Sequence, residues 1–284
     1  MKIAIVYFSG TGNTEKVLKE FESFFKIQNN KVKMIKIESG EYIPTDIDIL
    51  IIGYPVHAFN APKIVLDYFN NISFFKEGLP TYIVKTSGEG LTLNNGSSNK
   101  LTSILKNKGI TTFNEYHYLM PYNIIFRHSD KMAYKMWKTV LELIPLDAKE
   151  ILDKKRIVIK YSLGTKFVSN ALRIEQPGAH IIGSGFEVNN NCIHCGLCEK
   201  NCPTKNIIIK NNKVYFKEKC MICMRCVFNC PKDAIKPGIL NRWKVNGQYS
   251  FSYSDNEKCK HPNYCKRSYK KYFDKSNEKI NSNK

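Results

Sequence analysis

Hydrophobic positions in the first half of the chain alternate between two spacings. Five short apolar runs are continuous, as in strands buried on both faces of a parallel sheet; they cover residues 2–8, 31–37, 47–54, 82–85 and 116–120. Between and after these runs, apolar residues recur at helical spacing, from about residue 13, over 64–69, over 101–105 and over 130–144. The alternation of strand and helix predicts an α/β fold with an open, doubly wound, five-stranded parallel sheet.

A loop rich in glycine and hydroxyl groups follows the first predicted strand. It reads Ser9-Gly10-Thr11-Gly12-Asn13-Thr14, and ligands of doubly wound sheets bind beyond the carboxyl ends of the strands. Backbone N–H groups of a tight loop at a helix N-terminus attract phosphate, and the hydroxyls add hydrogen-bond donors. The loop lacks lysine and departs from both common nucleotide-binding glycine patterns. It therefore predicts a phosphate site without a cation; the alternative is a turn that only caps the helix.

This loop resembles the phosphate loop of flavodoxins, which bind FMN. The stretches 53–62, 86–88 and 120–123 also resemble that family and follow later predicted strands. The resemblance implies a flavodoxin-like domain over residues 1–163, with Phe59 or Tyr122 stacking on the flavin. His57 is either a flavin contact or a solvent-facing loop residue, and a domain without FMN is the alternative. The residues assigned to FMN are Ser9, Gly10, Thr11, Gly12, Asn13, Thr14, Pro55, Val56, His57, Ala58, Phe59, Thr86, Ser87, Gly88 and Glu89.

Eight of the ten cysteines form an internal repeat. Cys192-x-x-Cys195-x-x-Cys198-x-x-x-Cys202-Pro203 recurs 28 residues later as Cys220-x-x-Cys223-x-x-Cys226-x-x-x-Cys230-Pro231. The spacing resembles that of bacterial ferredoxins, in which the fourth cysteine of a run binds the other cluster. It implies two 4Fe-4S clusters in a domain over residues 186–236. One cluster is held by Cys192, Cys195, Cys198 and Cys230, the other by Cys220, Cys223, Cys226 and Cys202. Zinc sites use other spacings, and disulfide frameworks suit small secreted domains.

The remaining segments predict less. Residues 164–185 form a candidate linker with a flexible break at 183–185, and residues 237–284 form a basic C-terminal extension. In that extension, Cys259, His261 and Cys265 could bind a metal, pair as a disulfide or remain free thiols. Arg225 lies inside the second cysteine run, where its charge would raise the potential of the adjacent cluster unless it points to solvent.

Composition and charge limit the class of partner. The chain of 284 residues is 43% hydrophobic and 24% charged, ordinary values for a globular protein. Its longest apolar runs are too short for a membrane span or a signal-peptide core, so we expect a cytoplasmic protein. The net charge of +19 favours an acidic redox partner, with a generally solvated surface as the alternative. We expect no nucleic-acid partner, because no recognition motif is present.

The two halves together resemble fusion proteins of anaerobic bacteria in which a flavodoxin-like domain precedes a two-cluster ferredoxin. The implied function is electron transfer, with electrons relayed between FMN, two 4Fe-4S clusters and a redox partner protein. One alternative is a flavin-dependent reductase of a quinone or an unsaturated carbonyl compound, with His57 or Tyr122 as the proton donor. The other is an iron–sulfur redox sensor. The sequence gives no direction of electron flow and no oligomeric state.

Overall fold

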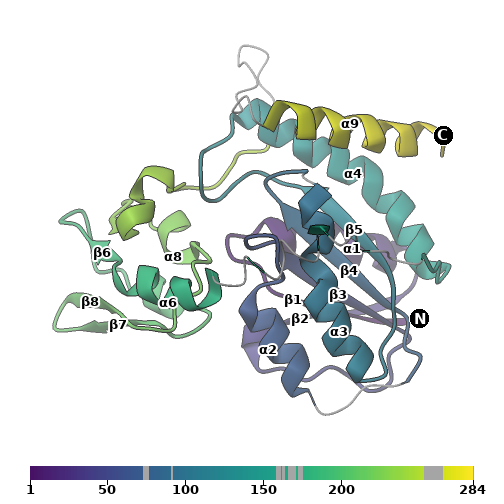
Figure 1. Ribbon diagram of the computed structural model, residues 1–284, viewed down its shortest axis with the longest axis horizontal. Coiled ribbons are helices and arrows are strands. Elements are labelled where there is room, and N and C mark those ends of the chain that lie inside the picture. Colours follow the sequence, from purple (N-terminus) through teal and green to yellow (C-terminus); the bar gives the residue numbers. More distant parts are fainter. Residues whose placement is uncertain are drawn as a thin grey trace.

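The first half of the chain forms a parallel sheet of five strands. The structure is a computed structural model that describes residues 1–72, 77–90, 92–157, 161, 164–165, 171, 175–252 and 265–283. The strands are β1 (Lys2–Tyr7), β2 (Lys31–Lys36), β3 (Ile49–Pro55), β4 (Thr81–Ser87) and β5 (Thr112–Leu119). They lie in the order β2-β1-β3-β4-β5, all parallel (Figure 1). This is the flavodoxin-like order of a doubly wound sheet, so the predicted fold is confirmed.

Two helices cover each face of this sheet. Helices α1 (Asn13–Ile27) and α4 (Asp130–Leu152) lie on one face, and α2 (Lys63–Asn71) and α3 (Asn99–Asn107) lie on the other. Successive strand residues point to opposite faces. Ile3 and Ile5 therefore pack with α1 and α4, while Ala4 and Val6 pack with α2 and α3. The continuous apolar strands are explained by burial on both sides.

Helix α4 is longer than the predicted helix over residues 130–144. It continues through Pro145 to Leu152. Proline removes one helical hydrogen bond, the one that the carbonyl of Leu141 would accept. Leu141 is 42% exposed, so water can reach this part of the helix. The apolar stripe also continues beyond the proline with buried Ala148 and Ile151, and this packing holds the last two turns on the sheet.

The cysteine-rich region is built from two copies of one small unit. The first copy contains β6 (Glu187–Val188), α7 (Leu197–Lys200) and β7 (Ile207–Lys210); the second contains β8 (Lys213–Phe216), α8 (Arg225–Phe228) and β9 (Ile235–Lys236). Strand β6 pairs with β9 and β7 pairs with β8, both antiparallel. Helices α7 and α8 are offset by 28 residues, as the cysteines are. The sequence repeat is therefore a structural repeat.

Three further elements join and follow these two regions. They are α6 (Glu175–Ser184), the short 3₁₀ helix η4 (Gly238–Trp243) and α9 (Lys266–Asn281). Helix α6 includes Gly183, where the sequence favoured a flexible break; a Cβ atom there would lie 2.0 Å from the Cβ of Cys220. Gly183 therefore serves a close approach to the second cysteine run. Helix α9 lies along α4 (Figure 1). In the described part of the chain, no helix has the length and apolarity needed to cross a membrane.

Candidate functional site

The phosphate-like loop connects β1 to the first turn of α1. Gly12 is the N-cap residue and offers no side chain to the orphan N–H groups of that turn. Ser9 Oγ accepts the N–H of Glu15 at 3.2 Å, and the Thr14 hydroxyl lies 2.8 Å from the Thr86 hydroxyl on β4. No lysine or arginine side chain belongs to this loop. The loop thus offers amides and hydroxyls at a helix N-terminus, a donor set that fits a phosphate group.

A cavity of about 420 Å³ opens next to this loop at the carboxyl ends of β1, β3, β4 and β5. We call it the loop cavity. All the residues assigned to FMN line it except Gly12. Met120, Pro121, Tyr122 and Asn123, which follow β5, also line it. The volume falls within the range of small-molecule and cofactor sites. Four loops that are distant in sequence therefore meet where a doubly wound sheet binds its ligand.

Hydrogen bonds fix the loops around the cavity to one another. The Asn13 side-chain amide donates to the carbonyl of Pro121 at 2.7 Å, and the Asn123 amide donates to Thr11 Oγ1 at 3.0 Å. The Tyr122 ring stacks on His128, with centroids 5.6 Å apart, and packs tightly against Gly88. The loop after β5 is therefore tied to the phosphate-like loop on one side and to the loop after β4 on the other.

The loop after β3 contains a strained turn. His57 and Asn60 exchange two backbone hydrogen bonds, of 2.9 and 2.7 Å, around Ala58 and Phe59. Both central residues have positive φ, 38° and 60°, which Asn-Gly pairs normally provide. Phe59 is thereby held half-buried in the cavity wall, and the surrounding protein lowers the pKa of His57 to about 4. His57 is thus a neutral imidazole at neutral pH, and the turn fits the kind of strain found at functional sites.

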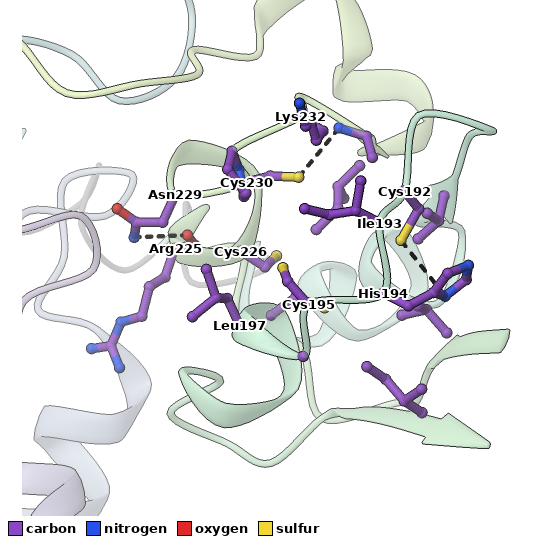
Figure 2. A pocket seen from close by; sticks show the side chains of 18 residues that line it. Cys192, Ile193, His194, Cys195, Leu197, Arg225, Cys226, Asn229, Cys230 and Lys232 are labelled. Carbon is purple, nitrogen blue, oxygen red and sulfur yellow. Dashed lines mark hydrogen bonds between the residues drawn. The ribbon is translucent and has the colours of Figure 1, made fainter. Parts of the chain in front are cut away.

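The eight repeated cysteines divide between two pockets. Cys192, Cys195, Cys198 and Cys230 line the first pocket, together with Cys226. Cys202, Cys220, Cys223 and Cys226 line the second. Figure 2 shows the sulfur atoms of Cys192, Cys195, Cys226 and Cys230 directed into the first pocket. The fourth cysteine of each run thus lies with the first three of the other run, and Cys226 borders both pockets.

The spacing of the cysteines suits clusters better than single zinc ions. Among the residues that the structure describes, no group of three or more His, Cys, Asp or Glu side chains is arranged around one metal ion. A zinc site needs each sulfur about 2.3 Å from a single point, whereas a cubane is bound at separate iron corners. Burial raises the pKa of the Cys223 thiol to about 12, and a thiol that coordinates a metal is deprotonated.

The backbone of the two runs repeats the same unusual conformation. Positive φ occurs at His194 and Ile222, at Gly196 and Met224, and at Lys205 and Asp233, and each pair is 28 residues apart. Positive φ is unfavourable for a β-branched residue such as Ile222. The N–H groups of Asn206 and Ala234 donate to the sulfurs of Cys202 and Cys230, at 3.2 and 3.3 Å. Such N–H···S bonds tune cluster potentials, and the structure provides them symmetrically.

Arg225 joins the second cysteine run to the phosphate-like loop. Its Nη2 atom donates to the carbonyl of Ser9 at 2.7 Å and pairs with Glu38 at 2.5 Å, and its Nε atom donates to the carbonyl of Gly10 at 3.0 Å. The guanidinium points away from the cysteines (Figure 2). The hypothesis of a free cation beside the cluster is therefore revised, since Glu38 offsets the charge. A Cβ atom on Gly10 would also lie 2.7 Å from the carbonyl oxygen of Cys223.

The second cysteine run also forms part of the loop cavity. Met221 and Ile222 stand between Cys220 and Cys223 and line the cavity, as does Ala179 of α6. Met221 and Cys223 pack against the core on the α2 and α3 face of the sheet. The first run lies nearer the surface: Cys195 is exposed and Ile193 is 55% exposed. The second run therefore lines the cavity, whereas the first run has residues at the surface.

Comparison with known proteins agrees with the cysteine geometry. Residues 186–240 match the family described as a 4Fe-4S dicluster domain. The matched residues include all eight repeated cysteines. The dicluster domain accounts for two 4Fe-4S clusters and gives the chain a redox role.

Other matches cover parts of the chain. An uncharacterised protein of Methanocaldococcus jannaschii is 39% identical over 50 residues, which are 18% of this chain and 20% of that protein. Among solved structures, a flavodoxin of Streptococcus pneumoniae TIGR4 is 13% identical over 54% of this chain and 99% of its own, with a TM-score of 0.40. A Fusobacterium nucleatum flavodoxin mutant bound to flavin mononucleotide is 22% identical over 55% of this chain and 97% of its own, also with a TM-score of 0.40. The flavodoxin-like assignment rests on strand order.

The basic extension contributes residues to this region that sequence reasoning missed. Tyr249 and Tyr269 are buried and hydrogen-bonded to the loops after β5 and β4, respectively. Cys265 is buried beside Glu89, with 3.6 Å between its sulfur and a carboxylate oxygen. Cys259 and His261 lie outside the described residues. The repeated tyrosines of the extension were a signal, but no local pattern connects them to strands more than a hundred residues earlier.

Proposed function

We propose that this chain transfers electrons between FMN in the loop cavity, the two 4Fe-4S clusters and a redox partner protein. The observation that carries the proposal is the placement of Met221 and Ile222. These residues link two cysteines of one cluster site and at the same time line the loop cavity. A flavin there would lie next to the second cysteine pocket, with no other element of the described chain needed to connect them.

The residues of the cavity suit FMN by their chemistry. The amides of the phosphate-like loop and the hydroxyls of Ser9, Thr11 and Thr14 would hold the phosphate. Phe59, Tyr122 and the loop at 86–89 would border the ring, and neutral His57 would stand at its edge. When bound, FMN exchanges one or two electrons, whereas each cluster exchanges one. The protein would then bind and orient the FMN and exclude water from it.

The positions of the pockets give an order of sites. The loop cavity adjoins the second cysteine pocket through Met221 and Ile222, and Cys226 borders both cysteine pockets. The first pocket is next to solvent, where Cys195 and Ile193 are exposed. We therefore propose the order flavin, second pocket, first pocket and partner protein. We also place the protein in the cytoplasm, where thiols stay reduced.

The surface around the first pocket suits an acidic partner. Lys200, Lys210, Lys213 and Lys232 are exposed on this domain, and the partly exposed side chains of Ile193 and Leu197 line the first pocket together with Lys232. An apolar centre within a positive field favours an acidic redox protein by steering its approach. The rate of electron transfer to an acidic ferredoxin should then fall as ionic strength rises.

One experiment tests both the cofactors and their order. Anaerobic purification should give about eight irons and one FMN per chain. Cys223→Ser and Cys195→Ser should each remove about half of the iron. The flavin of Cys195→Ser should still exchange electrons rapidly with the remaining cluster, whereas that of Cys223→Ser should not, as followed by flavin absorbance after rapid mixing with a reductant.

Three results would contradict the proposal. If the purified protein held zinc or no metal at the cysteines, the assignment of two 4Fe-4S clusters would be wrong. If the cluster-loaded protein bound no FMN, the assignment of the loop cavity as an FMN site would be wrong. If the two cysteine variants lost electron exchange between flavin and cluster equally, the proposed order of sites would be wrong. Stoichiometric oxidation of NAD(P)H with a quinone would instead support a small-molecule reductase.

A further inference from the structure

The segment after the dicluster domain passes between the second cysteine run and the loop after β5. On one side, the Asn246 side chain donates to the carbonyls of Val227 and Cys230, at 2.7 and 2.9 Å. On the other, Arg127 donates to the carbonyls of Asn246, Gly247 and Gln248. The segment is therefore bonded to both regions at once.

Tyr249 lies at the end of this segment and is 5% exposed. Its hydroxyl donates to the carbonyl of Tyr122 at 2.7 Å and accepts the N–H of His128 at 3.2 Å. The two bonds bracket the turn that carries Tyr122 into the cavity wall. A phenol held by one donor and one acceptor leaves this turn little freedom to shift.

Tyr269, in the first turns of α9, reaches the loop after β4. The N–H of Tyr122 donates to His128 Nδ1 at 3.2 Å, so the neutral ring carries its proton on Nε2. Nε2 then donates to the Tyr269 hydroxyl at 2.7 Å, and that hydroxyl donates to the carbonyl of Gly88 at 2.7 Å. One uncharged chain of hydrogen bonds thus joins Tyr122 to Gly88, two residues that pack against each other in the wall of the loop cavity.

A second contact of α9 holds the neighbouring residue of the same loop. Ser268 Oγ donates to one carboxylate oxygen of Glu89 at 2.5 Å, and the Tyr122 hydroxyl donates to the other at 3.3 Å. Glu89 is buried, and its carboxylate also accepts a hydrogen bond from the Cys265 thiol at 3.6 Å. The conformation of Gly88 and Glu89 is therefore set jointly by α9 and by Tyr122.

We infer that the C-terminal extension completes the FMN site, with Tyr249 and Tyr269 as positioning residues for the loops that border the flavin ring. This inference rests on the proposed function, because it concerns the same cavity. Neither tyrosine lines the cavity, so each acts through Tyr122 or Gly88. The basic charge of the extension did not indicate a function. By this inference, the extension belongs to the cofactor site.

The test uses the full chain with clusters loaded and FMN removed. Tyr249→Phe and Tyr269→Phe keep the ring and remove one hydroxyl. Each leaves a buried polar group without its partner, which should raise the Kd for FMN about tenfold. Tyr42→Phe is the matched control, since Tyr42 is 90% exposed. The readouts are Kd from quenching of flavin fluorescence, the visible circular dichroism of bound FMN, and iron content.

Each outcome decides one point. Weaker FMN binding and altered flavin dichroism in both variants, with iron content and Tyr42→Phe unchanged, support the inference. A lower unfolding midpoint with unchanged Kd and dichroism overturns it and leaves the tyrosines a purely structural role. If the unmodified chain binds no FMN, the proposed function fails together with this inference; if it binds FMN and the variants bind equally well, only this inference fails.

Discussion

The two cysteine runs have the same spacing and backbone but opposite surroundings. The first run lies at the surface, with Cys195 exposed. The second lies against the flavodoxin-like half, where Met221 and Ile222 line the loop cavity and Cys223 approaches Gly10. The shared spacing can only specify how a cluster is held. The residues between the cysteines differ, and they decide which cluster site borders the loop cavity and which lies at the surface.

Position 225 and its repeat counterpart illustrate this difference. Arg225 is 16% exposed by its side chain and bonds to three backbone carbonyls and to Glu38. Leu197 occupies the same place in the first run and is 40% exposed. An arginine fork can satisfy several acceptors at once. The two runs therefore differ at this position. The second run has an arginine that bonds to the phosphate-like loop, and the first run has an exposed apolar residue.

Replacing Arg225 by the residue of the other run should have the largest effect. Arg225→Leu leaves the Glu38 carboxylate and the carbonyls of Ser9 and Gly10 without this partner. Removing one side of a largely buried ion pair should lower the free energy of unfolding by about 3 kcal/mol. Leu197→Ala, on the exposed side, should change it by less than about 0.5 kcal/mol. Urea unfolding of the cluster-loaded proteins measures both.

Adding Glu38→Gln to Arg225→Leu should restore part of the stability, because the unpaired buried charge is then removed. The potential of the second cluster should change little in this double variant, since the loss of the arginine charge is offset by the loss of the Glu38 charge. A large potential shift without loss of stability would show that Arg225 acts on the cluster and not through its bonds to the phosphate-like loop.

Helix α6 offers a smaller and sharper test of the second run. Gly183→Ala places a Cβ atom 2.0 Å from the Cβ of Cys220, so the helix or the cysteine must move. Overpacking of this kind should cost about 2 kcal/mol. Gly178→Ala on the same helix meets nothing within 4 Å and should stabilise by about 0.5–1 kcal/mol, as alanine favours the helix.

Thermal unfolding and iron retention of these two variants are the measurements. We expect Gly183→Ala to lose iron more readily than Gly178→Ala, since it displaces a cysteine of the second pocket. Equal stability and iron content in the two variants would mean that α6 is a linker, as its sequence first suggested.

The sequence predicted those features whose signal is local. Continuous apolar strands and helical spacing predicted a doubly wound, five-stranded parallel sheet, and this sheet is confirmed. The cysteine spacing predicted two cluster sites, which the dicluster match supports. The phosphate-like loop could be recognised because its glycines and hydroxyls follow one strand directly. In each case the physical cause, burial on a face or a tight turn, acts on consecutive residues.

The features that were missed depend on contacts between distant residues. Arg225 and Glu38 are 187 positions apart, and Tyr269 and Gly88 are 181 apart. Nothing near Gly183 in the sequence shows that Cys220 will lie against it, so the glycines there suggested flexibility. Ala58-Phe59 likewise gives no local signal for a turn with positive φ, because neither residue favours it.

His57 lines the loop cavity, as do Met221 and Ile222 of the second run. Replacing His57 should have the smallest effect on stability of the changes considered. Its folded-state pKa is lowered to about 4 from an ordinary value of 6.5, because burial disfavours the charged ring. Between these values the unfolded chain binds more protons, so this residue stabilises the fold above pH 6.5 and loses that contribution as pH falls towards 4. Urea unfolding of FMN-free protein at pH 7 and pH 5 should show a stability difference on the order of 1 kcal/mol larger in the unmodified chain than in His57→Gln. If the unfolding free energy of both proteins had the same pH dependence, His57 would be exposed to water. The second cysteine run would then not shield the cavity from water.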